Sequence, residues 1–269
     1  MLVKLIKRKI NYGWRVAATG MSFVSFGVGG VVIAGCIAPI LKLTAKTPAQ
    51  REQQAKLVIK YAFKSFVLLV NKLGVMSYHI EGLEKLQSAP QELVIANHPT
   101  LIDVVLLLAA MKPAHCVVKQ ALLDNPFTHG PISSAGYIIN AGSEQFIQDC
   151  IATLKQDEQS SLLIFPEGTR TAKAEILNDF QRGAANIALR TQLPIRPIVI
   201  RCTPSTLSKN EKWYKIPQRA FHIEIKIMDA LQLNDLLEDL SVNPRNVRAL
   251  NRQLQQFFYR ELSKTVANE

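Results

Sequence analysis

Hydrophobic and polar residues follow one pattern before residue 76 and another after it. Beyond residue 76, short apolar runs rich in β-branched residues predict strands at 92–96, 115–119, 137–140, 161–165, 196–202 and 221–227. Between these runs, residues 101–111, 143–156, 181–191 and 241–262 have the apolar spacing of helices. Such alternation indicates an α/β fold with a mostly parallel sheet flanked by helices, and it predicts a functional site at the loops that leave the strands' C-terminal ends.

The first 75 residues have a different pattern. The 26 residues from Val16 to Leu41 carry no charge, and as a helix they would extend about 39 Å, enough to cross a bilayer core of roughly 30 Å. Residues 55–74 combine a wide apolar face with a basic remainder, which is typical of an interfacial helix or of half a membrane hairpin. We therefore expect residues 1–75 to form a two-helix membrane element and residues 76–269 to form the functional domain.

The charge distribution agrees with this division. The net charge is +11, and residues 1–75 account for all of it, with twelve Lys or Arg and one acid, Glu52. Residues 76–269 are neutral, which argues against a nucleic-acid partner. A basic arm around an apolar segment instead predicts membrane lipids as partners.

The cysteines also limit the class of protein. Cys36, Cys116, Cys150 and Cys202 form no C-x-x-C pair, which argues against a zinc site or a disulfide framework and fits a reducing compartment. Residues 33–36 resemble a bacterial lipoprotein cleavage box, which would place the protein outside the cell on a lipid anchor. The apolar run continues past Cys36, which disfavours that alternative.

Two loops at predicted strand ends carry the candidate chemistry. In the first, His98 follows the strand at 92–96, and Thr100 and Asp103 match a capping box that alone would explain the segment as a helix start. The functional interpretation uses the same geometry: a helix N-terminus keeps His98 neutral, and Asp103 accepts its other ring N–H. No Ser or Cys occupies a nucleophile elbow, so this base would activate a hydroxyl of the substrate.

The second loop is Phe-Pro-Glu-Gly-Thr-Arg-Thr, residues 165–171. Gly168 and Thr169 offer backbone N–H groups, and Arg170 offers a planar fork for phosphate. Glu167 is unusual in an anion site unless it orients a substrate hydroxyl or Arg170. A turn with a surface ion pair is the alternative.

Together, N-H-x4-D and F-P-E-G-T-R, about 65 residues apart, resemble the glycerolipid acyltransferase family, whose bacterial archetype is 1-acylglycerol-3-phosphate acyltransferase. The resemblance runs from about residue 80 to 230 and includes segments 117–130, 180–189 and 193–200. One position departs from the family pattern, because Asn140 stands in a segment that usually carries an arginine nearby.

The resemblance implies acyl transfer from acyl-CoA or acyl-carrier protein to the free hydroxyl of a lysophospholipid, with 1-acylglycerol-3-phosphate giving phosphatidate as the expected case. It implies His98 and Asp103 as the catalytic pair and no metal or other cofactor. The residues expected to bind the acceptor are Glu167, Gly168, Thr169, Arg170, Lys119 and Arg182. Two alternatives stay open: an acyltransferase of a specialised bacterial lipid, such as an aryl polyene or ornithine lipid, and a non-catalytic lipid-binding protein on the same scaffold.

The N-terminal arm, residues 1–75, predicts on which side of the membrane the site lies. Five cations before the apolar segment predict a cytoplasmic N-terminus. One full crossing would then put the site outside, away from acyl-CoA. We therefore expect residues 16–74 to form a hairpin or a half-inserted pair, with the site facing the cytoplasm at a bacterial inner membrane. The sequence does not indicate an oligomeric state.

Overall fold

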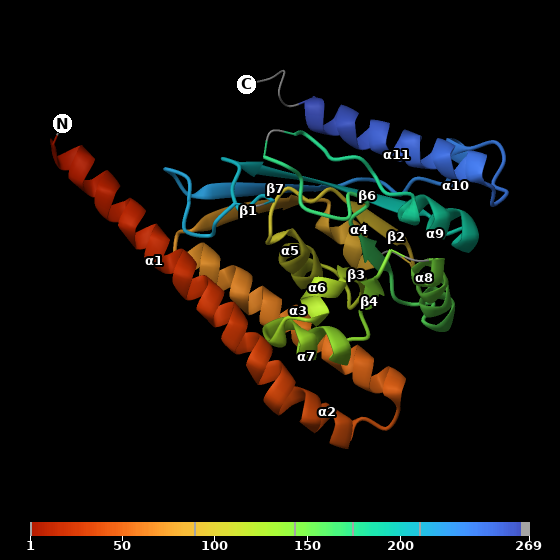
Figure 1. Cartoon of the computed structure of the whole chain (residues 1–269), viewed down its shortest axis with the longest axis horizontal. Helices are drawn as coiled ribbons and strands as arrows, with labels where there is room; N and C mark the ends of the chain where they lie inside the picture. The colour runs from red at the N-terminus through yellow and green to blue at the C-terminus, as the bar shows by residue number, and fades with distance from the viewer. Residues whose placement is uncertain (1, 89, 143, 174, 210, 265–269) are drawn as a thin grey trace.

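The chain folds into a sheet with helices on both faces and a long N-terminal helix along one side (Figure 1). The computed structural model describes residues 2–88, 90–142, 144–173, 175–209 and 211–264. The helices are α1 (Leu2–Val32), the π-helical segment η1 (Ile33–Ile37), α2 (Ala38–Thr44), α3 (Pro48–Lys72), α4 (Leu83–Ser88), α5 (Asp103–Ala110), α6 (Gln120–Leu123), α7 (Pro126–Ser134), α8 (Glu144–Gln156), α9 (Gly183–Thr191), α10 (Leu233–Leu236) and α11 (Pro244–Ser263). The strands are β1 (Met76–Glu81), β2 (Leu93–Ala96), β3 (His115–Lys119), β4 (Ile138–Asn140), β5 (Leu162–Ile164), β6 (Ile195–Thr203) and β7 (Phe221–Ile227).

The strands form one sheet in the order β1-β7-β6-β2-β5-β3-β4. Neighbours are parallel except for β6 and β7, which are antiparallel. This confirms the expected mostly parallel sheet, and the six predicted strands are β2 to β7. The sequence pattern does not predict β1, which lies at the edge of the sheet and whose residues after the buried Met76 alternate between exposed and half-buried. The first residue of the helix predicted at 143–156 lies outside the described residues, and α8 begins at Glu144.

Two apolar cores lie on opposite faces of the sheet. Along β2, Val94 and Ala96 face the core shared with α3 and α5, whereas Leu93 and Ile95 face the core shared with α8, α9 and α11. Successive strand residues point to opposite faces, and both faces are covered, so the central strands are apolar throughout.

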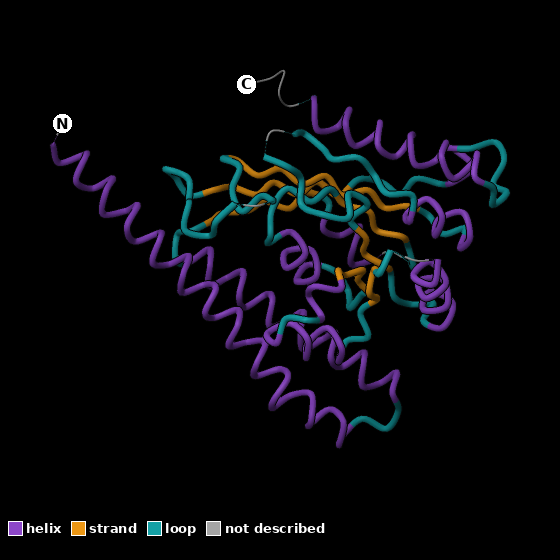
Figure 2. The backbone as a smooth tube through the Cα atoms, viewed as in Figure 1, coloured by secondary structure: helices purple, strands orange, loops and turns teal. Residues whose placement is uncertain are grey.

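The apolar N-terminal segment forms one continuous helix from α1 through η1 to α2 (Figure 2). Its part from Ile6 to Thr44 is the one helix of the described chain that is long and apolar enough to cross a bilayer. Length and composition alone define this property, and a core helix or a signal sequence can share it. The chain then turns at residues 45–47, where the Thr47 hydroxyl accepts a hydrogen bond from Gln50 N (3.1 Å) and starts α3.

Helix α3 corrects the expectation of a two-helix membrane element. It packs against α5 and buries Val67 and Val70 in the core on that face of the sheet, whereas its Ala55 and Ile59 lie in a smaller cluster with η1. Because α3 contributes to the core of the α/β domain, α1 through α2 is the one long apolar helix with an exposed face among the described residues. The expected domain boundary at residue 75 stays a prediction. Helix α3 lies before that boundary but packs against residues that follow it.

Helix α1 approaches α7 so closely that the contact requires glycine. A Cβ atom on Gly30 would lie 2.0 Å from the carbonyl oxygen of Phe127, and a Cβ atom on Gly130 would lie 2.2 Å from the Cβ atom of Ala34. A Cβ atom on the neighbouring Gly29 would meet nothing from the rest of the fold within 4 Å. Small residues thus let the two helix backbones touch.

Gly30→Ala should separate α1 from α7, because the new methyl group would collide with a backbone carbonyl. We expect a loss of about 1–3 kcal/mol in the free energy of unfolding, measured by thermal unfolding of the full chain in detergent. Gly29→Ala is the matched control, and it should leave the melting temperature unchanged or raise it, since alanine is the better helix former. Equal melting temperatures for Gly30→Ala and Gly29→Ala would contradict the close contact.

A buried polar cluster holds α3 to the N-terminal edge of the sheet. Lys56 Nζ lies 3.0 Å from His115 Nδ1, and His115 Nε2 lies 3.0 Å from Asp157 Oδ2. Lys56 and His115 are each 3% exposed. Burial, and then the Lys56 charge, lowers the pKa of His115 despite the opposing Asp157 carboxylate. The contacts fit a neutral ring that donates from Nε2 and accepts at Nδ1.

The lowered pKa of His115 predicts acid sensitivity. Below a pH of about 6.5 the unfolded chain binds a proton that the folded chain does not yet bind, so stability should fall as the pH decreases through this window. His115→Gln should flatten this dependence between pH 7 and 5, measured by denaturant unfolding at each pH. His79→Gln, at an exposed position of β1, is the control and should retain the wild-type slope. A His115→Gln protein with the wild-type slope would refute the assignment.

Candidate functional site

The parallel strands bring the candidate residues to one edge of the sheet. Strands β3, β5, β2 and β6 are adjacent and parallel, so their C-terminal ends meet at this edge. His98 follows β2, residues 165–171 follow β5, and Lys119 ends β3. The sheet topology therefore places these candidate residues at the C-terminal ends of parallel strands, as expected.

Asn97 fixes the position of the loop after β2. Its side-chain amide donates to Ile200 O (2.8 Å) and accepts from Ile200 N (2.7 Å), so it continues the pairing of β2 with β6 beyond the last strand residue. Asn97 is 1% exposed. Sequence reasoning assigned no role to Asn97, although its place directly before the histidine was a usable signal.

His98 and Asp103 form a hydrogen-bonded pair at the start of α5. His98 Nδ1 lies 2.9 Å from Asp103 Oδ2, and Asp103 is fully buried. The same carboxylate accepts from Thr100 N (2.7 Å) and from the Thr100 hydroxyl (2.6 Å), which is the carboxylate half of a capping box. The expected cap itself is wrong, because Ile102 is the N-cap of α5, without a side-chain cap bond, and Asp103 is the first helical residue. The His98 ring packs against Phe165 at 4.4 Å between centroids. Its side chain is 15% exposed, so the ring is reachable from solvent while its partner is not.

Glu167 joins the two candidate loops. Its carboxylate accepts from His98 N (2.7 Å), from the Thr171 hydroxyl (2.9 and 3.0 Å) and from Asn178 N (2.9 Å). It is 3% exposed, and burial raises its pKa against these donors. Glu167 contacts neither Arg170 nor an open surface in the described structure. In this geometry Glu167 positions the His98 loop, and its expected contact with the acceptor stays a prediction. Thr171 and Asn178, which hold its carboxylate, were not singled out by sequence reasoning.

The turn after β5 leaves one of its two expected N–H groups free. Gly168 has a φ of +63°, a conformation that suits glycine, and its N–H donates to Phe165 O (3.0 Å). In the described part of the chain, the Thr169 N–H makes no hydrogen bond. Thr169, rather than Gly168, is the backbone donor that remains for a ligand.

Three cations gather near this turn. Arg170 Nη1 donates to Leu207 O (2.8 Å) and Ser208 O (3.1 Å), which ties the turn to the loop after β6. Burial lowers the pKa of Lys119, and the nearby charges of Lys209 and Arg170 lower it further. Burial also lowers the pKa of Arg170, against the nearby Asp103 carboxylate. Lys209 has no local sequence signal, since only the fold brings it to Lys119.

The side-chain contacts described for Arg182 and Asn140 involve neither the His98 pair nor the cations near the turn after β5. Arg182 lines a groove of about 210 Å³ between α9 and α11, together with Arg190 and Val247. The Asn140 side chain accepts from Gly142 N (2.9 Å) and shapes its own turn. No described contact joins Arg182 to the His98 pair or to the Lys119 cluster.

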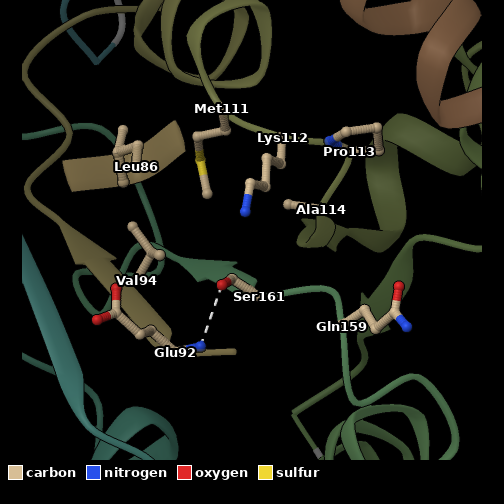
Figure 3. Close-up of a pocket in the computed structure, with 9 residues that line it drawn as sticks. All are labelled: Leu86, Glu92, Val94, Met111, Lys112, Pro113, Ala114, Gln159 and Ser161. Carbon is tan, nitrogen blue, oxygen red and sulfur yellow. Dashed lines mark hydrogen bonds between the residues drawn. The ribbon is translucent and has the colours of Figure 1, made fainter. Parts of the chain in front are cut away.

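Two other features of the described chain bear on the chemistry. Cys202 lies near this edge, but burial raises the pKa of its thiol to about 12, so it does not supply a thiolate at neutral pH. No group of three or more His, Cys, Asp or Glu in the described chain is placed to hold a metal ion. A small cavity of about 10 Å³, lined by residues such as Val94, Met111 and Ser161 (Figure 3), lies at the N-terminal ends of the strands, opposite His98.

Sequence comparison connects this site with known proteins. Residues 77–201 match the family model described as Acyltransferase. The Caenorhabditis elegans protein acl-2, named for 1-acyl-sn-glycerol-3-phosphate acyltransferase activity, is 31% identical over 188 residues, which cover 67% of this chain and 64% of that protein. The 1-acyl-sn-glycerol-3-phosphate acyltransferase of Helicobacter pylori is 33% identical over 125 residues, covering 44% of this chain and 53% of that enzyme. The chain thus spans between about half and two thirds of the length of these relatives.

A solved structure shares the fold over nearly the whole chain. The 1-acyl-sn-glycerophosphate acyltransferase PlsC from Thermotoga maritima superposes with a TM-score of 0.70 and 20% identity, covering 97% of this chain and 98% of that one. The likeness includes the N-terminal helices as well as the sheet. The family match, the named relatives and the shared fold agree with the motifs around His98 and Glu167. Residues 77–201 thus match the acyltransferase family, and the two relatives are named as 1-acyl-sn-glycerol-3-phosphate acyltransferases.

Proposed function

We propose that this chain transfers a fatty acyl group from a thioester, acyl-CoA or acyl-carrier protein, to the free hydroxyl of a lysophospholipid. The expected acceptor is 1-acylglycerol-3-phosphate, and the product is then phosphatidate. The observation that carries the proposal is the 2.9 Å contact between the reachable His98 ring and the fully buried Asp103 carboxylate.

The proposed step uses His98 as a general base. The ring Nδ1–H donates a hydrogen bond to the Asp103 carboxylate, which leaves the lone pair of Nε2 for the acceptor hydroxyl. Nε2 takes the proton of the acceptor hydroxyl as the oxygen attacks the thioester carbonyl. When the tetrahedral intermediate collapses, the C–S bond breaks and the departing thiolate takes the proton back from His98. Asp103 stabilises the transient imidazolium, and the free N–H of Thr169 is a candidate donor for the oxyanion.

The acceptor headgroup would bind at the cation cluster. Lys119 and Lys209 are exposed, and Arg170 keeps guanidinium N–H groups beyond the one that holds the loop after β6. Clustered cations near the end of a strand favour a phosphate ester. The turn at Asn140 lacks the arginine that the family usually has nearby. A specialised bacterial lipid is therefore the alternative acceptor.

The arm would hold this site at the membrane. The continuous helix α1 through α2 exposes apolar side chains along one side, while α3 returns the chain to the α/β domain. We propose that the arm inserts into one leaflet and that the site faces the cytoplasm at a bacterial inner membrane. Lipid acceptor and lipid product would then enter and leave along the bilayer.

His98→Ala should lower kcat by about 10²–10⁴-fold, because the reaction would lose its base. The assay is transfer from acyl-CoA, and separately from acyl-carrier protein, to lysophosphatidate and to other lysolipids. His79→Ala, at an exposed position of β1, should retain wild-type activity. Equal activity from His98→Ala and the wild type would refute the mechanism, and binding of lipid without turnover by the wild type would favour the non-catalytic alternative.

Lys119→Ala should raise KM for a phosphate-bearing acceptor about 10-fold or more with a smaller change in kcat, because a charge-assisted contact would be lost in the bound state. Lys155→Ala, at the exposed end of α8, is the matched control. An unchanged KM for lysophosphatidate, or activity on an uncharged acceptor alone, would contradict the phosphate assignment and favour a specialised lipid.

A further inference from the structure

The loop between β6 and β7, residues 204–220, combines exposed aromatic and basic side chains. Trp213 is 43% exposed and Tyr214 is 45% exposed. The loop has four cations and one acid, Glu211. The cations, all exposed, are Lys209, Lys212, Lys215 and Arg219.

The positive charge of this loop is not neutralised within it. Glu211 is occupied, because its carboxylate contacts Lys173 Nζ (2.9 Å) and accepts from Ser208 N (3.3 Å). Lys212 lies 5.7 Å from the centre of the Tyr214 ring, so its ammonium stays at the surface beside an aromatic face. The loop therefore presents a cationic, aromatic surface.

The loop is attached to α1. The Trp213 ring lies against Gly20, where an added Cβ atom would come within 3.3 Å, and its centroid is 5.9 Å from that of Phe23. The buried Arg15 guanidinium donates to Pro217 O (3.0 Å) and Gln218 O (2.7 Å). Figure 2 shows the loop beside this part of α1. Two contacts of different chemistry thus hold the loop in place on the helix.

Exposed apolar side chains continue along α1 beyond the attachment point. From this point, Met21, Val24, Val28 and Val31 recur at helical spacing, and each is more than half exposed. Tryptophan and tyrosine prefer the level of the lipid headgroups, and lysines beside them attract anionic headgroups. A basic loop with aromatic residues next to an apolar helix face matches the chemistry of a bilayer surface.

We propose that the β6–β7 loop is a second membrane contact, made by the α/β domain itself, and that its partner is an anionic phospholipid bilayer. The inference rests on the proposed function only in placing the arm at a membrane. Leu207 and Ser208 of the same loop hold Arg170. The loop that touches the headgroups therefore also sets the position of a cation of the candidate site.

The test uses the full chain with Trp14→Phe, which leaves Trp213 as the one tryptophan. The protein is reconstituted into phosphatidylcholine vesicles with or without phosphatidylglycerol, and the phosphatidylcholine is brominated near the headgroup end of its acyl chains. We expect bromine to quench Trp213 emission, more strongly with phosphatidylglycerol. Lys209→Gln/Lys212→Gln/Lys215→Gln should lose the dependence on phosphatidylglycerol.

The matched control is Arg245→Gln/Arg248→Gln/Arg252→Gln, which removes three exposed cations from α11 on the other face of the sheet and should quench as the parent does. Trp213 emission that bromine does not quench but aqueous iodide does, from protein bound to vesicles through its arm, would overturn the proposal and indicate water or a protein partner. Acyl transfer is measured on the same samples. Active protein with unquenched Trp213 refutes only this inference, whereas quenched but inactive protein refutes only the proposed function.

Discussion

The candidate site depends on one buried carboxylate, that of Glu167. It accepts hydrogen bonds from the backbone of the His98 loop and from Thr171 and Asn178 in its own loop. Hydrogen bonds to a charged group stabilise by about 1.5–3 kcal/mol each, and a buried donor without its acceptor is costly. The carboxylate therefore fixes the distance between the loop after β2, which carries His98, and the turn after β5, which carries Arg170.

Asp103 has a similar double role on the other side of the histidine. It begins α5 by accepting from Thr100, and it accepts from the His98 ring with the same carboxylate. Its complete burial keeps water from competing for these bonds. The bonds at the start of α5 and the proposed proton transfer thus use the same carboxylate.

The arm and the α/β domain are connected more closely than a simple anchor would require. Helix α3 packs into the core on one face of the sheet, and its Lys56 contacts His115 at the start of β3. Helix α1 contacts α7 at Gly30. The loop after β6 contacts α1 through Trp213 and holds Arg170 on its other side. A bilayer that positions α1 would therefore also position the edge of the sheet where the candidate site lies.

The sequence by itself determined the elements and the two motifs. Short apolar runs predicted β2 to β7, because strands such as β2 and β5 are buried on both faces and admit little but apolar residues. The motifs N-H-x4-D and F-P-E-G-T-R predicted the candidate catalytic pair and the turn. It did not determine β1, whose half-exposed edge position weakens the apolar signal, or the place of α3, because an amphipathic helix can cover a core as well as a membrane. The tertiary structure alone decided which polar groups meet across the chain. In the folded chain the Glu167 carboxylate is buried, Arg182 lines a separate groove between α9 and α11, and Lys209 lies near Lys119. These placements leave no local pattern in the sequence, because contacts between residues tens of positions apart depend on strand order.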